Sequence, residues 1–241
     1  TRGEVRAGDS LTVPEVLEEL EDTVILSGHI HRPGDYQWSP GMSLTDLISS
    51  LDELKPDVDT SYVLVRREQA SVEPITVFST NLGEALKNPR GTADVRLESR
   101  DTVHDFRRAG DRQEVVSELL QELSLHTSQD RPAQRVQISG NVRAPGVYPM
   151  EAQMRISDLI RAGGDLNEAA YTLEAELTRY SVAGDARREV DVVTVDLAAI
   201  RRGDTAADLQ LREYDYLKIS RLPDWESTWT VALEGELRFP G

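Results

Sequence analysis

The chain has 241 residues, with 43 acidic and 27 basic side chains and a formal net charge of −16. Such an acidic surface repels phosphate groups, which argues against a nucleic-acid partner and against attraction to an anionic membrane. The sequence has no cysteine, so disulfide bonds and thiolate chemistry are excluded, and no apolar run reaches the length of a membrane-spanning helix.

The chain contains repeated sequence modules. Residues 1–20 are predicted to be the tail of a preceding module followed by a short helix, because residues 6–13 resemble the end of such a module. We expect the chain to be a segment of a longer protein. It begins at Thr1 rather than Met, and it stops just after a turn that should lead into a strand.

One phrase, Val-x-(Ile/Leu)-x-Gly-x-x-x-x-Pro-Gly, occurs three times, at residues 24–34, 136–146 and 231–241. Alternating apolar and polar residues predict a half-buried strand in each copy. Pro-Gly then predicts a type II turn with a positive φ at the glycine, after which the chain returns as a second strand. The residues assigned to this structural motif are Gly28, Pro33, Gly34, Gly140, Pro145, Gly146, Gly235, Pro240 and Gly241.

A helix is predicted after each complete hairpin. In the first copy, Leu44, Leu47 and Ile48 follow the spacing of one apolar helix face. The second copy of this helix reaches Gly163 and Gly164, where a left-handed residue is expected to end the helix. The first copy has no such glycines, so its helix is expected to end differently.

Matching landmarks along each copy give the domain boundaries. The complete modules are predicted at 21–108 and 135–222, and residues 109–134 are predicted to be a linker that contains an amphipathic helix. Residues 223–241 are predicted to form a joint and the opening hairpin of a truncated third module. A hairpin, one main helix and further strands predict an α+β fold with a mixed sheet, for which the β-grasp arrangement is the best match.

The sharpest metal-like pattern is His29-x-His31, because two histidines at this spacing on a strand face the same side and can share a zinc ion. The repeat argues against this reading. The matching positions of the second copy are Asn141 and Arg143, and no further ligands accompany the pair. We therefore predict no metal and no cofactor.

Catalysis is also disfavoured. Asp101 and Asp215 recur just before a strand, and Asp46 and Asp158 recur at a helix start, so both pairs have local structural roles to explain them. The sequence has no Ser-His-Asp pattern and no phosphate-binding loop, so no convergent catalytic set is visible. The prediction is that the protein is not an enzyme.

Two kinds of residue are candidates for ligand binding. Tyr36, Trp38 and Tyr148 could stack on a ring of a ligand, although a recurring tyrosine favours a role in packing. Arg66 and Arg179, aligned after the third strand of each module, could bind an acidic ligand, although pairing with nearby carboxylates is favoured in so acidic a chain.

The second copy resembles a known family. Gly-x-Val-x-x-Pro-Gly-x-Tyr at 140–148, followed by Ile-Ser-Asp-Leu-Ile-x-Ala-Gly-Gly at 156–164, is similar to the soluble-ligand-binding β-grasp (SLBB) domain. The resemblance implies tandem β-grasp modules. Such tandem copies are typical of bacterial polysaccharide export proteins related to the outer-membrane capsule translocon.

From this resemblance we expect a non-enzymatic periplasmic segment that forms part of an oligomeric conduit for capsule or exopolysaccharide. The implied partners are other copies of the protein in a homo-oligomeric ring, the polysaccharide, and an inner-membrane polysaccharide co-polymerase. The implied location is the periplasm, with attachment to the outer membrane through parts of the parent protein that this chain does not include. The alternative is a soluble module that binds a sugar or small molecule through an aromatic face.

Overall fold

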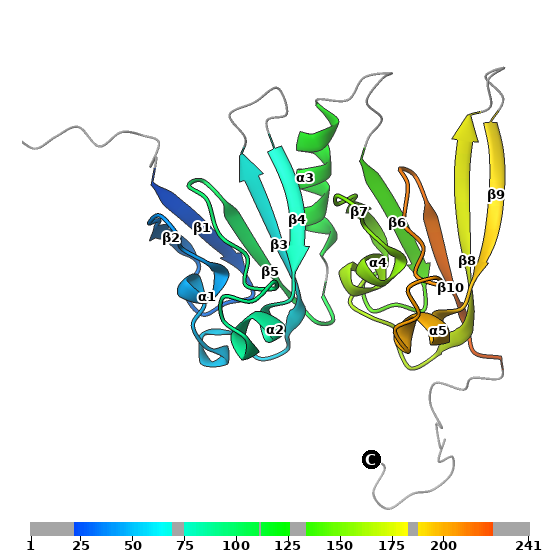
Figure 1. Cartoon of the computed structure of the whole chain (residues 1–241), viewed down its shortest axis with the longest axis horizontal. Helices are drawn as coiled ribbons and strands as arrows, with labels where there is room; N and C mark the ends of the chain where they lie inside the picture. The colour runs from blue at the N-terminus through cyan, green and yellow to red at the C-terminus, as the bar shows by residue number, and fades with distance from the viewer. Residues whose placement is uncertain (1–21, 69–74, 111, 126–133, 183–187, 224–241) are drawn as a thin grey trace, which may run out of the picture.

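The computed structural model describes residues 22–68, 75–110, 112–125, 134–182 and 188–223. These residues form two α+β modules, each built on one five-stranded mixed sheet (Figure 1). The predicted tail and helix of residues 1–20 lie outside the described residues. So does the predicted third hairpin, with Gly235, Pro240 and Gly241.

The two modules repeat one order of elements. The first contains β1 (Thr23–Gly28), β2 (Gly34–Gln37), α1 (Leu44–Leu47), the 3-10 helix η1 (Leu51–Glu53), β3 (Val58–Glu68), β4 (Ile75–Thr80), α2 (Leu82–Lys87) and β5 (Thr102–Arg107). The second contains β6 (Arg135–Gly140), β7 (Gly146–Pro149), α4 (Ile156–Ala162), β8 (Ala170–Val182), β9 (Arg188–Val195), α5 (Leu197–Arg201) and β10 (Tyr216–Arg221). Helix α3 (Gln113–Ser124) lies between them in the chain.

The sheets have the strand orders β2-β1-β5-β3-β4 and β7-β6-β10-β8-β9. In each, the first hairpin strand pairs in parallel with the last strand, and the other neighbours are antiparallel. The strand orders and orientations of the two modules are therefore identical.

The strand registers correct one sequence alignment. Val65 pairs with Val103 in the first module, and Leu177 pairs with Leu217 in the second. Arg179 therefore matches Arg67, so the alignment of Arg179 with Arg66 is wrong by one residue. The slip has a physical cause: residues 62–65 are buried on both faces of the sheet, so they show no alternation that fixes the register.

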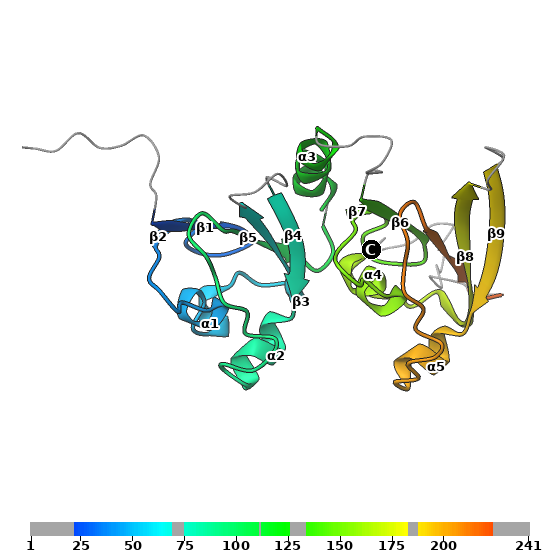
Figure 2. The ribbon, with the colours of Figure 1, turned by 45° about the horizontal axis from the view of Figure 1, so that its top comes forward.

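Each sheet has an inner face that packs on the short helices of its own module. In the first module, Val24, Leu26 and Val103 lie on this face in one core with α1 and α2. The outer face of the first sheet, which carries Tyr62 and Leu64, packs instead into the core of the second module and α3. Figure 2 shows α1 and α2 on one side of the first sheet and α3 on the other. The two modules therefore share a continuous apolar contact.

The Pro-Gly turns differ between the hairpins. Gly34 has the predicted positive φ, +146°, with open space around it. Gly146 does not have a positive φ, so that prediction is wrong for the second copy. A Cβ at Gly146 would lie 2.2 Å from the side chain of Gln113 in α3, so close packing explains this glycine instead. Gly164 has φ +76° and ends α4 as predicted, whereas α1 ends at Ile48 in an extended conformation.

Candidate functional site

Each module holds a fully buried aspartate that is bound by an arginine of the neighbouring strand. Asp101 accepts hydrogen bonds from Arg67 Nε at 3.0 Å and Nη2 at 2.8 Å. Asp215 accepts the same bonds from Arg179 at 3.0 and 2.7 Å. These hydrogen bonds raise the pKa of both arginines, so both guanidinium groups stay charged. Arg179 therefore has a structural partner.

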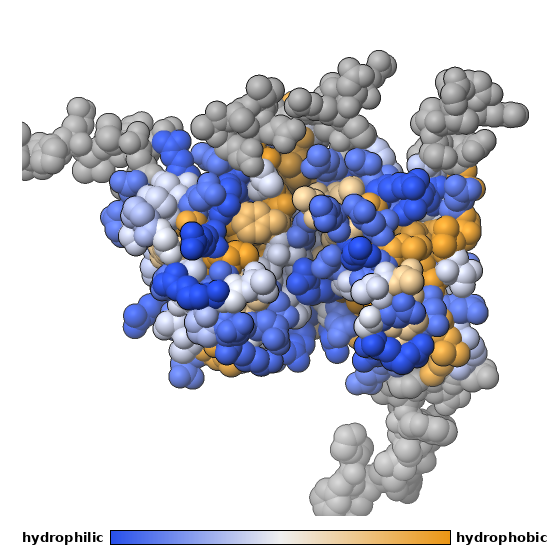
Figure 3. Space-filling view, viewed as in Figure 1, coloured by the Kyte–Doolittle hydropathy of each residue, from blue (hydrophilic) through white to orange (hydrophobic). Residues whose placement is uncertain are grey.

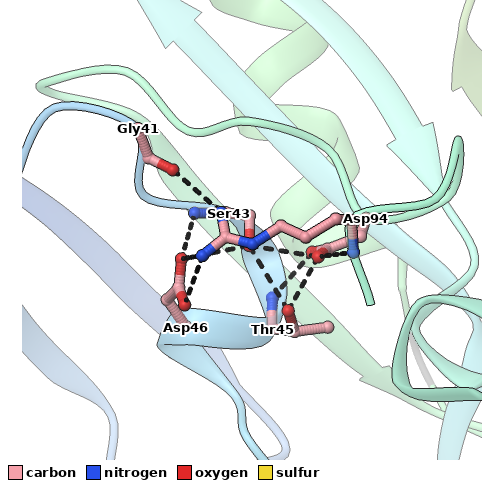
Figure 4. Close-up of polar contacts among 6 residues, drawn as sticks. Gly41, Ser43, Thr45, Asp46 and Asp94 are labelled. Carbon is pink, nitrogen blue, oxygen red and sulfur yellow. Dashed lines mark hydrogen bonds and ion pairs between the residues drawn. The ribbon is translucent and has the colours of Figure 1, made fainter. Parts of the chain in front are cut away.

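A second recurring aspartate fixes the start of the first helix in each module. Asp94 accepts the backbone N–H of Thr45 at 2.9 Å and its hydroxyl at 2.7 Å, and also the hydroxyl of Ser43 at 3.1 Å (Figure 4). In the second module, Asp208 binds Ser157 at the same two distances, 2.9 and 2.7 Å. In both modules this aspartate therefore has a structural role, because its hydrogen bonds hold the first turn of the helix.

The helix-start aspartates predicted from the sequence also have structural partners. Asp46 accepts the backbone N–H of Ser43 at 2.8 Å, which is visible in Figure 4, and Asp158 accepts that of Arg155 at 3.0 Å. Each carboxylate satisfies an N–H group that the helix leaves free. The recurring carboxylates are therefore spread over separate local roles.

The recurring tyrosines close their own hairpins. Tyr36 donates to the carbonyl of Arg32 at 2.6 Å, and Tyr148 donates to that of Ala144 at 2.7 Å. Tyr148 is fully buried and meets Tyr62 edge-on, with ring centroids 6.4 Å apart. The surface around Tyr148 in the second module is therefore covered by the first module.

Tyr36 instead borders an open hollow of about 470 Å³ on the first hairpin. The lining residues are Ile30, His31, Arg32, Tyr36, Asp52 and Glu53. Among the described residues, nothing covers this hollow, whereas the matching surface around Tyr148 is covered. The hollow combines an aromatic ring with charged groups of both signs. This hollow is the candidate ligand surface.

The other predicted ligand residues lie elsewhere. Trp38 donates its indole N–H to the carbonyl of Leu97 at 2.8 Å and packs against the first core. Arg66 binds Glu122 of α3 through two nitrogens and also Glu68 at 3.0 Å. The structure therefore does not bring the five candidates together into one site.

The histidine pair has no metal-like surroundings. His29 Nε2 lies 2.7 Å from the carbonyl oxygen of Pro56. Within the described ranges, no group of three or more His, Cys, Asp or Glu side chains is arranged to hold a metal ion. No helix in the same ranges combines the length and apolar character needed to cross a membrane.

The sequence reasoning missed the polar centre of the junction between the modules. Arg112, only 1% exposed, pairs with buried Asp59 and donates to the carbonyl of Ala162 in the second module at 2.8 Å. Its guanidinium carbon lies 5.5 Å from the ring centre of Tyr62 and 5.4 Å from that of Phe106. From the sequence alone, a charged residue just before a helix is expected to face solvent. No local pattern indicates that Arg112 is buried.

Comparison with known families finds one match: residues 135–190 are similar to the SLBB domain. The matched segment runs from β6 into β9 and includes Tyr148 and Arg179. No curated protein matches the chain. The match supports an SLBB domain, a ligand-binding rather than a catalytic domain, in the second module.

Proposed function

We propose that the chain is a non-enzymatic periplasmic segment of a polysaccharide export protein and forms part of an oligomeric conduit for capsule or exopolysaccharide. The match of the second module to the SLBB domain supports this most strongly, because this domain occurs in polysaccharide export proteins. The first module extends the argument, since it has the same strand order and the same buried Arg–Asp pair.

In this proposal the modules act as rigid blocks. The continuous core between them holds the pair in one orientation, and other copies of the protein complete a ring. The net charge of −16 and exposed acidic residues such as Glu174 and Glu176 keep an anionic polymer hydrated and unattached. An inner-membrane co-polymerase would deliver the polymer, and parts of the parent protein outside this chain would attach the assembly to the outer membrane.

The proposal is tested by deleting the gene in the producing organism. We expect loss of surface polysaccharide, recovery of the protein in the periplasmic fraction, and restored export on complementation. A complementing Tyr36→Ala variant should restore export as well, because the passive conduit does not need the hollow. Unchanged surface polysaccharide in the deletion strain would overturn the export role.

The hollow beside Tyr36 favours a second candidate, a module that binds a soluble sugar or small molecule. Calorimetry with neutral and acidic oligosaccharides would then show saturable binding that Tyr36→Ala abolishes. Tyr36→Phe is the matched control, because it keeps the ring and removes only the hydrogen bond to Arg32. Trp38→Ala is unsuitable, since Trp38 packs against the first core and its loss would also affect stability. Absence of saturable binding to every oligosaccharide would exclude this function.

A further inference from the structure

The junction between the modules contains buried polar atoms that lack a hydrogen-bond partner among the described residues. They include Tyr62 Oη, Arg112 Nε, Glu151 Oε1 and Arg161 Nε. A buried polar atom without a partner costs roughly 1–3 kcal/mol. A change in the protonation of one of these groups therefore alters the stability of the contact between the modules.

Glu151 is the group that crosses from the second module to the edge of the first sheet. Its Oε2 accepts the backbone N–H of Ser79 at 2.6 Å. Ser79 lies on β4, an edge strand, where the outward N–H groups have no neighbouring strand in the sheet. Arg161 of α4 adds a hydrogen bond to the Ser79 hydroxyl at 3.1 Å. Glu151 and Arg161 together hold the second module on β4.

This contact is not part of the repeat. When the hairpins of the two modules are aligned, Ser39 of the first matches Glu151 of the second. When strands β4 and β9 are aligned by their registers, Thr194 of the second module matches Ser79 of the first. The repeated fold therefore does not require a carboxylate at position 151. Its presence is specific to the junction.

We propose that Glu151 is an acid-closed latch, which holds the modules together when it is protonated and loosens the junction when it ionises. A protonated carboxyl group keeps Oε2 as the acceptor for Ser79 and carries its hydrogen on Oε1, which has no hydrogen-bond partner among the described residues. Ionisation spreads a negative charge over both oxygens, and Oε1 still has no donor to stabilise it. A buried, incompletely hydrogen-bonded charge costs more than a neutral hydroxyl in the same position, so the ionised form is the costly one.

The surrounding charges agree with this direction. Burial raises the pKa of Glu151 above its ordinary 4.5, and the hydrogen bonds from Ser79 and the charge of Arg161 offset it only in part. Asp158 of α4 adds to the increase, and Tyr62 of β3 and Arg112 line the same junction. A carboxyl group with a raised pKa stabilises the docked state at acid pH. This stabilisation is lost as the pH rises through the raised value.

The test follows the Ser79 amide of the full chain by NMR from about pH 4 to about pH 8, a range that spans the expected titration. We expect its chemical shift to titrate with a midpoint above 4.5. Its hydrogen-exchange protection factor should fall about tenfold for each pH unit by which the midpoint exceeds that value.

Glu151→Gln, which keeps an acceptor but cannot ionise, should give a Ser79 amide whose shift and protection do not change with pH. Glu118→Gln, on the exposed side of α3, should leave the wild-type titration unchanged. A Ser79 shift that does not titrate in the wild type, or an equal fall in protection in Glu151→Gln, would overturn the latch. If Glu151→Gln fails to fold, the wild-type titration alone decides.

Discussion

The two modules share one fold but differ on the outer faces of their sheets. In the first sheet, Tyr62 and Leu64 are fully buried under α3 and the second module. The strand registers give Glu174 and Glu176 as their counterparts in the second sheet, and both are exposed. The surface that joins the first module to the second is therefore absent from the second.

The last two strands of each sheet show the same contrast. Val77 of β4 is 6% exposed, whereas its counterpart Val192 of β9 is 63% exposed, and Ile75 and Val190 differ similarly at 7% and 53%. Figure 3 shows apolar surface over β8 and β9. In a repeat array each unit contacts its neighbours, so the residues that differ between the copies decide which neighbour each module accepts.

The largest expected effect is at the junction. Arg112→Ala removes the partner of buried Asp59 and should lower the free energy of unfolding by about 3–5 kcal/mol, the usual cost of an unpaired buried charge. Denaturant unfolding measures this, with Arg108→Ala on the surface as the control. A loss below about 1 kcal/mol would show that Arg112 does not join the modules.

The next largest effect is a pH dependence of stability that arises in the first module and not in the second. Asp105 is 2% exposed, and burial raises its pKa from 3.8 to about 6, whereas its counterpart Ile219 cannot titrate. A raised pKa means that stability is greatest in acid and falls as pH rises through about 6. The shift corresponds to about 3 kcal/mol.

Asp105→Asn should remove most of this pH dependence and stabilise the protein at about pH 8. Unfolding at several pH values measures it, and Asp52→Asn at an exposed position is the matched control. If Asp105→Asn keeps the wild-type slope of stability against pH, another group is responsible.

A third prediction concerns what the modules share. Asp101→Asn and Asp215→Asn each weaken charge-assisted hydrogen bonds to an arginine, and each should cost about 2 kcal/mol. Because the geometry is the same in both copies, the two losses in denaturant unfolding should agree to within about 0.5 kcal/mol. A large difference would mean that the modules do not use this pair equally.

The sequence predicts the hairpins and the α+β fold because these depend on local patterns: alternating strands, Pro-Gly turns and one apolar helix face. Helices α2 and α5, of 6 and 5 residues, are too short to show periodicity and were missed.

The candidate site was less predictable because it depends on contacts between distant residues. The one-residue slip at Arg66 arose in a strand that is buried on both faces. Arg112 lies between the modules in the chain and contacts Asp59 of the first and Ala162 of the second. Glu151 of the second module binds Ser79 of the first. No local pattern reveals these distant partners. Tyr36 borders the hollow of the first hairpin, and this hairpin was recognised from the repeat.

The smallest effect is expected where α3 meets the outer face of the first sheet. Arg66, with its side chain 18% exposed, binds Glu122 of α3, and the matching residue of the second module is Thr178, which has no helix above it in the described structure. Arg66→Ala should cost about 1 kcal/mol, because the pair is partly solvated, while Thr178→Ala should change stability by less than about 0.5 kcal/mol. Hydrogen exchange in α3 should increase only in Arg66→Ala. Equal stability losses in the two variants would show that the ion pair between Arg66 and Glu122 does not stabilise the contact of α3 with the first sheet.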